Sequence, residues 1–191
     1  MTEPLTLAEA KSHLRITHSS EDDYITSLVQ ASRLQVERDS WRAIVRGSRV
    51  VTLDDFPPGS DPIYLPSPPL VSVESVVYLD GNGDEQSVEG FRVDATHEPG
   101  LIVPAYGESW PETRAGVGAV TITFTAGYAD GEVLEDTRHL IRLKLSELYE
   151  GRSPAVSERR TTYDRMLELI RFRDYRIRGT LLGNVTDGLG V

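Results

Sequence analysis

The sequence predicts an α+β protein: a helical core built from both chain ends, an inserted antiparallel β domain and a flexible C-terminal arm. Three observations lead to this prediction. Apolar residues recur at helical spacing near both ends, short β-like segments bounded by Pro and Gly fill the middle, and four glycines fall within the last 13 residues. We place the helical core at 1–42 and 131–178, the β domain at 43–130 and the arm at 179–191.

The N-terminal region predicts two helices that pair as a hairpin. Thr6 and Glu9 form a capping-box pattern, which opens a short helix to about Ile16. A second helix follows Ser20, a suitable N-cap, and runs to about Trp41, with three acids near the positive end of its dipole. Its predicted apolar face is Ile25, Leu28, Val29, Ser32 and Val36.

Short β segments occupy the middle of the chain. Proline and glycine clusters separate them, and the glycine-rich stretch from Asp80 to Asp84 predicts a tight hairpin turn. The last segment alternates apolar residues with threonine, the pattern of a half-buried strand. We expect strands at Val45–Leu53, Val73–Leu79, Phe91–Val93, Leu101–Val103 and Ala119–Thr125.

Helix returns near Glu132. Apolar residues on more than one face of this third helix predict burial on two sides. Gly151 to Pro154 ends it, and a fourth helix is expected from about Arg159 to Phe172. Its apolar face is Tyr163, Met166, Leu167 and Ile170, and the glycine-rich end beyond it predicts a flexible arm.

Composition excludes several classes of protein. The 191 residues include no cysteine, so the chain has no disulfide framework, no Cys-based metal site and no thiol nucleophile. No apolar run approaches the roughly 20 residues of a spanning helix, and the N-terminus lacks the features of a signal peptide. We therefore expect a soluble protein assembled in a cytosol. A net charge of −10 argues against a whole-surface nucleic-acid binder.

No motif predicts catalysis. The four histidines lack metal-ligand spacing, and nucleophile-elbow and Walker motifs are absent. The stretch Asp80–Asp84 resembles the start of a calcium loop, but position 12 of that loop is Phe91, so a hairpin turn is favoured. We expect no catalytic residue, no cofactor and no metal ion; a hydrolase with carboxylates gathered in the β domain stays an alternative.

Charge is unevenly distributed along the chain. Residues 1–151 carry 12 basic and 25 acidic residues, whereas residues 152–178 carry eight arginines and four acids. An acidic body with an Arg-rich segment favours contacts between unlike surfaces, for example between copies of the chain; a solvated amphipathic helix is the alternative. The apolar residues of the arm could order on a partner's sheet edge or groove, or belong to a frayed terminus.

Several motifs follow one another in a characteristic order. They are LTLAEAKSHLRI and EDDYITSLVQASRLQVE near the N-terminus, then Leu65–Val73, Tyr78–Asp80, Phe91–Asp94, Trp110-Pro111, Thr125–Asp130 and Leu148–Arg152. Together, over about residues 4–152, they resemble phage head–tail connector (adaptor) proteins, in the longer branch that carries a β insertion. The sequence departs from this pattern before the third helix, where it has no proline, and in the Arg-rich segment.

The resemblance implies a structural protein in the neck of a tailed double-stranded DNA phage or phage-derived particle. Its relatives form a ring of roughly twelve copies, so we expect a homo-oligomer, a dodecamer, assembled in the host cytoplasm. The expected partners are the portal protein above and a stopper or tail-completion protein below, with no membrane. The portal or neighbour-subunit contact candidates are Arg159, Arg160, Arg165, Arg171, Arg173, Tyr175, Arg176, Ile177, Arg178, Leu181 and Leu182.

The same resemblance gives the acidic charge a role. Twelve copies at −10 each would carry a charge of about −120 before screening, which would keep passing DNA from adhering. The channel-lining candidates on the second helix are Glu21, Asp22, Asp23, Glu37 and Asp39; the third helix is another candidate lining. Two alternatives remain: another virion connector component (stopper or tail-terminator), and a nucleic-acid-binding module that uses the Arg-rich helix.

Overall fold

The computed structural model describes residues 2–114, 116–151, 161–172 and 186–187. These residues form helices and antiparallel sheets, which confirms the expected α+β class. The chain divides into two compact units. The helical unit is Met1–Val45 with Tyr128–Phe172, and the β unit is Arg46–Gly127 with the C-terminal segment.

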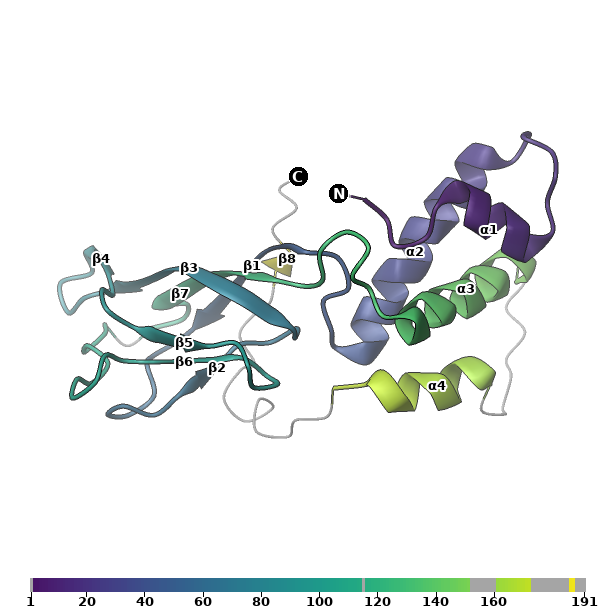
Figure 1. Cartoon of the computed structure of the whole chain (residues 1–191). Helices are drawn as coiled ribbons and strands as arrows, with labels where there is room; N and C mark the ends of the chain where they lie inside the picture. The colour runs from purple at the N-terminus through teal and green to yellow at the C-terminus, as the bar shows by residue number, and fades with distance from the viewer. Residues whose placement is uncertain (1, 115, 152–160, 173–185, 188–191) are drawn as a thin grey trace. The chain divides into compact units, whose positions relative to one another are not determined.

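The helical unit joins helices from both sides of the β insertion (Figure 1). The helices are α1 (Leu7–Leu14), α2 (Asp22–Ser40), α3 (Glu135–Glu150) and α4 (Thr162–Ile170). Because α3 contacts each of the other three helices, its apolar residues are needed on more than one face. The core of the helical unit contains residues of the predicted apolar faces. Its fully buried members are Leu5, Ala10, Ile25, Val36, Ile44, Leu140, Ile141 and Leu145.

Two helices begin with the hydrogen bonds of a capping box. Thr6 and Glu9 cap α1 as predicted, and Thr161 with Asp164 caps α4 two residues after the expected start. The prediction for α2 is wrong. Its N-cap is Glu21, which makes no side-chain capping bond, and the Ser20 hydroxyl bonds to His18 Nδ1 instead.

The β unit contains two antiparallel sheets (Figure 1). In the five-stranded sheet the strand order is β4-β3-β7-β1-β8, and in the three-stranded sheet it is β2-β6-β5. The strands are β1 (Gly47–Leu53), β2 (Ile63–Tyr64), β3 (Leu70–Leu79), β4 (Glu85–Ser87), β5 (Arg92–Asp94), β6 (Leu101–Val103), β7 (Val120–Ala126) and β8 (Thr186–Asp187).

The core of the β unit follows from strand alternation. Along β7 every second residue is buried, and the threonines between them lie on the other face. Phe56 stacks on Trp110 with ring centroids 5.0 Å apart and meets Tyr78 edge-on. The Trp110 indole also donates a hydrogen bond to the Asp61 carbonyl, which satisfies its polar atom beside the core.

The structure differs from the sequence expectation at several strands. β1 begins two residues later than expected, β3 begins three residues earlier, and β5 and β7 are each shifted by one residue; β2, β4 and β8 were not expected. β4 has the sequence Glu-Gln-Ser, without apolar alternation, and pairs with β3 because the Asp80–Asp84 turn returns the chain. Most of the predicted arm lies outside the described residues; its part Thr186–Asp187 pairs with β1.

Candidate assembly surfaces

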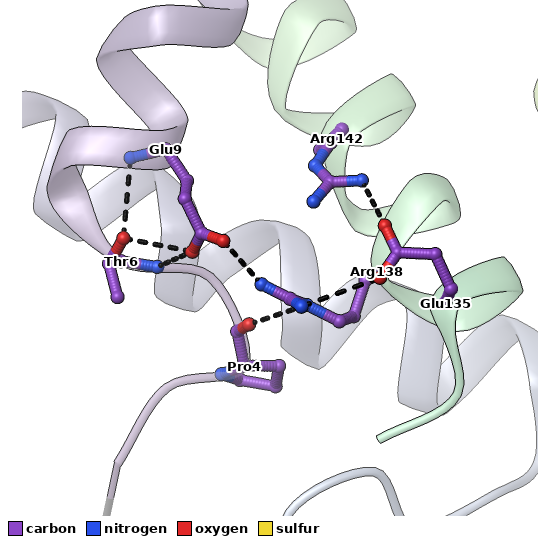
Figure 2. A network of polar contacts seen from close by, with 6 residues as sticks. All are labelled: Pro4, Thr6, Glu9, Glu135, Arg138 and Arg142. Atoms are coloured by element: carbon purple, nitrogen blue, oxygen red, sulfur yellow. Dashed lines mark hydrogen bonds and ion pairs between the residues drawn. The ribbon is translucent and has the colours of Figure 1, made fainter. Parts of the chain in front are cut away.

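Arg138 on α3 fastens the N-terminal segment to the helical unit (Figure 2). Its Nε donates to the Pro4 carbonyl at 3.0 Å, and a terminal nitrogen donates to Glu9 at 2.6 Å. The other terminal nitrogen reaches Glu135, which also accepts a 2.6 Å bond from Arg142. These contacts connect α1 and α3, which are more than 120 residues apart in the sequence.

Glu9 belongs to both this network and the cap of α1. Its carboxylate accepts hydrogen bonds from the Thr6 backbone N–H and hydroxyl, at 2.9 and 2.8 Å. These bonds, and then the contact with Arg138, hold the pKa of Glu9 below its ordinary value. Glu9 therefore stays ionised at neutral pH, as an acceptor for donors of two helices.

A second network, the buried clamp, consists of Arg33, Glu3 and Glu37. The Arg33 side chain is 7% exposed and donates two hydrogen bonds to Glu3, at 2.8 and 3.2 Å, and one to Glu37, at 2.9 Å. Burial alone would lower the pKa of Arg33, but the bonds and charges of the two carboxylates outweigh it and raise that pKa. The clamp fixes the N-terminal segment on α2.

The buried clamp also fixes the chain where it leaves the helical unit. Glu37 Oε1 accepts the backbone N–H groups of Ile44 and Val45, at 2.7 and 3.1 Å. Val45 pairs with Tyr128 in an isolated parallel bridge, so the outgoing and returning segments lie side by side within this unit. One carboxylate on α2 thus holds the last two residues of the outgoing segment within the helical unit.

An open pocket of about 250 Å³ lies beside these contacts, lined by the N-terminal segment, Val45, residues 128–131, Val133 and Arg138. The Arg138 guanidinium already donates hydrogen bonds to three acceptors of the same unit, so its contacts are structural. Among the described residues, no cluster of three or more His, Asp or Glu side chains could hold a metal ion. Asp80, the first residue of the calcium-loop-like stretch, accepts the N–H groups of Asn82 and Asp84 as in a turn.

The five predicted channel-lining acids lie in different environments. Asp23 is exposed in the first turn of α2. Glu21 and Asp22 are half-buried and bond to Tyr149 and Lys11. Glu37, 10% exposed, belongs to the buried clamp, and Asp39 accepts bonds from the Tyr163 hydroxyl and Gln35. Three of the five therefore lie at the N-terminal end of α2, but four of the five accept bonds from the unit's own side chains, and Asp23 is the exposed one.

Of the predicted contact residues, Arg165 and Arg171 lie within the described part of the chain. Both are exposed, on or directly after α4. The others, namely Arg159, Arg160, Arg173, Tyr175, Arg176, Ile177, Arg178, Leu181 and Leu182, lie outside the described residues. α4 itself is held by the Tyr163–Asp39 hydrogen bond and by Arg42 Nε, which donates to the Ile170 carbonyl at 2.6 Å.

Sequence reasoning missed several exposed apolar side chains. In the helical unit, Trp41 is 58% exposed and Leu169 is 83% exposed. Tyr106 and Val117 in loops of the β unit are almost fully exposed. Leu169 could have been found, because the apolar face of α4 leaves position 169 on the outer side; single exposed apolar residues of this kind are normal on protein surfaces.

A comparison with protein families finds a match over residues 4–92 to the phage gp6-like head-tail connector proteins. This match confirms the resemblance to head–tail connectors. The matched region includes α1, α2 and the first part of the β unit. No curated protein matches the chain.

Solved structures show the same fold over nearly the whole chain. A chain in the neck of the empty GTA particle, computed with C6 symmetry, has a TM-score of 0.74 at 23% identity, covering 90% of this chain and 91% of that one. A chain of the virion of the native gene transfer agent (GTA) particle gives the same values. A chain in the neck of the native GTA particle, computed with C12 symmetry, has a TM-score of 0.70 at 24% identity, covering 90% of each chain.

Proposed function

We propose that this chain is a structural head-to-tail connector in the neck of a phage-like particle. The observation that carries the proposal is the connector-family match over residues 4–92, in a fold shared with neck chains over 90% of the length. A structural connector is not an enzyme class. In the described part of the chain, no helix has both the length and the hydropathy to cross a membrane.

We propose further that the chain forms a ring. The structurally similar necks have cyclic symmetry, C6 in one case and C12 in another. In a closed ring each copy contacts its two neighbours through two different surfaces. Twelve copies, a portal protein above and a stopper or tail-completion protein below are the finer parts of this proposal.

The acidic surface is proposed to face passing DNA. Asp23, exposed in the first turn of α2, supports this role, whereas its neighbours Asp22 and Glu21 are half-buried and bonded to Lys11 and Tyr149. Glu37 and Asp39 offer less surface, since their carboxylates are held by Arg33 and Tyr163. A map of the ring with a basic or neutral lumen would refute the proposal.

Arg165 on α4 and Arg171 directly after it, both exposed, are proposed to contact the portal or a neighbouring copy, together with the segment from Arg159 to Val191. Removal of residues 159–191 tests this. The expected product folds but fails to join portal-bearing heads; normal docking of the truncated protein would show that this segment is not the contact. Because the truncation also removes α4, a full-length variant with both arginines changed to Ser serves as the milder comparison.

The connector function itself is tested by assembling particles without this chain and then adding the purified chain back. Heads assembled without this chain should carry a portal but no tail, and purified chain should restore tail attachment. Light scattering of the protein alone, and then with its portal, should show when the ring forms. Tails that attach normally in the absence of this chain would refute the function.

A further inference from the structure

β1 lies between β7 and the edge strand β8 in the five-stranded sheet. On its inner side, β7 pairs with all seven residues of β1. On its outer side, β8 pairs with Arg49 and Val50 alone, so the other five have no strand beyond them in the described part of the chain. Unpaired backbone groups along a strand are a template for pairing with another segment.

The sequence of β1 does little to prevent such pairing. Gly-Ser-Arg-Val-Val-Thr-Leu contains no proline, its single charged residue is Arg49, which already pairs with β8, and its register with β7 runs without a bulge. The opposite edge of the sheet is different, because β4 is only three residues long and polar. Natural sheets protect their edges with short strands, charges, prolines and bulges; β4 is short and polar, whereas β1 is seven residues long and has Arg49 as its one charged residue.

β8 shows which kind of segment this edge accepts. It is an antiparallel strand from the C-terminal part of the chain, with Thr186 opposite Val50 and Asp187 opposite Arg49. Fifteen residues separate Thr186 from the end of α4 at Ile170. Fully extended, that length of chain reaches about 50 Å, nearly twice the roughly 28 Å of α2. A linker of this length does not by itself confine β8 to β1 of its own copy.

We propose that β8 is exchanged between neighbouring copies in the assembled ring, so that residues 186–187 of each copy pair with residues 49–50 of the next. This inference rests on the ring proposed above. The hydrogen bonds are the same within a chain and between chains, so exchange loses no pairing. A ring holds the next copy's edge at high effective concentration, and each exchanged strand then ties its copy to a neighbour. In dilute monomer, pairing within the chain is expected instead.

Engineered cysteines distinguish the two pairings, because the chain has no cysteine of its own. Val50 and Thr186 are direct cross-strand partners, a spacing at which two cysteines can form a disulfide. Full-length Val50→Cys and Thr186→Cys chains, co-assembled in equal amounts into necks and then oxidised, can join only between copies. The expected product is a dimer of the 21.2 kDa chain whose linked peptides contain positions 50 and 186.

A matched control replaces Val50→Cys by Thr52→Cys, two residues along the same face of β1 and outside the β8 pairing. This mixture should give at least tenfold less dimer. The double variant Val50→Cys/Thr186→Cys should close within the chain as a dilute monomer and form a ladder of linked copies in necks. Oxidised necks in which the double variant links only within each copy would overturn the exchange. Necks that lack this chain altogether would instead refute the proposed function.

Discussion

Glu37 gives the most informative test of the buried clamp, because one carboxylate serves two kinds of donor. Its Oε2 accepts from Arg33, and its Oε1 accepts the backbone N–H groups of Ile44 and Val45. Glu37→Ala removes the ion pair and both acceptors. Since Arg33 is 7% exposed, its charge would lose one of two partners while still buried. Breaking a buried pair of this kind costs about 3–5 kcal/mol, so we expect Glu37→Ala to lower the free energy of unfolding by about 4 kcal/mol.

Glu37→Gln separates the two contributions. The amide oxygen can still accept from Ile44 and Val45, but the amide nitrogen then faces the Arg33 guanidinium, donor against donor. We expect a loss of about 2 kcal/mol, because the backbone acceptor is kept and the charge is lost. The difference between the two variants measures how strongly the carboxylate holds the start of the β insertion.

Urea unfolding followed by circular dichroism at 222 nm is the appropriate measurement, because the helices belong to the helical unit. A loss of 4 kcal/mol corresponds to a lower thermal midpoint by about 8–16 °C for a chain of this size. Glu150→Ala, at an exposed acid ending α3, is the control and should stay within about 0.5 kcal/mol of the parent. A Glu37→Ala variant within about 1 kcal/mol of the parent, or a Gln variant as damaged as the Ala variant, would refute the reasoning.

Three further predictions concern other contacts. The capping bonds lower the pKa of Glu9 from its ordinary 4.5, so its stabilising effect is complete above that pH and is lost as the pH falls through the lower folded value. The difference in urea midpoint between the parent and Glu9→Gln should therefore shrink between pH 6 and pH 3, and a constant difference would contradict this origin. Tyr163→Phe should cost about 1–3 kcal/mol in urea unfolding, because the hydroxyl donates to an ionised carboxylate on α2, and an unchanged midpoint would show that this bond contributes nothing. Gly100→Ala should destabilise the β unit by about 1–3 kcal/mol, because the new Cβ would overlap the Leu70 side chain, whereas Gly81→Ala meets nothing and should leave the near-ultraviolet thermal midpoint unchanged.

The helices could be predicted because burial of one face imposes a periodicity. Ile25, Val29 and Val36 recur on one side of α2 and all are buried. The same reasoning failed at Ser20, where the hydroxyl has a nearer partner in His18. A capping pattern gives the residue type at a helix start, but it cannot show which of several local acceptors and donors the side chain will choose.

The short strands were beyond the reach of pattern reasoning for a different reason. β4 is polar throughout, and β2 and β8 have two residues each, too few for a period of two. The pairing of β2 and β8 depends on strands that are distant in sequence, as in the register of Ile63 with Ile102. Long-range pairs of this kind are set by tertiary structure and leave little local signal.

The acids of α2 show the same limit and bear directly on the channel. A carboxylate on a helix can be solvated, or it can be the partner of a buried cation, and the helix sequence alone does not distinguish the two. In α2 the buried cation is Arg33, and its second partner, Glu3, lies 30 residues before it in the sequence. Charges that are paired inside the unit largely cancel one another at the distance of passing DNA, where salt screens fields within about 8 Å. The field in the lumen must then come from exposed acids such as Asp23. Asp23→Asn in every copy should accordingly change DNA retention in the channel more than Glu37→Gln does, although Glu37→Gln is the more destabilising change.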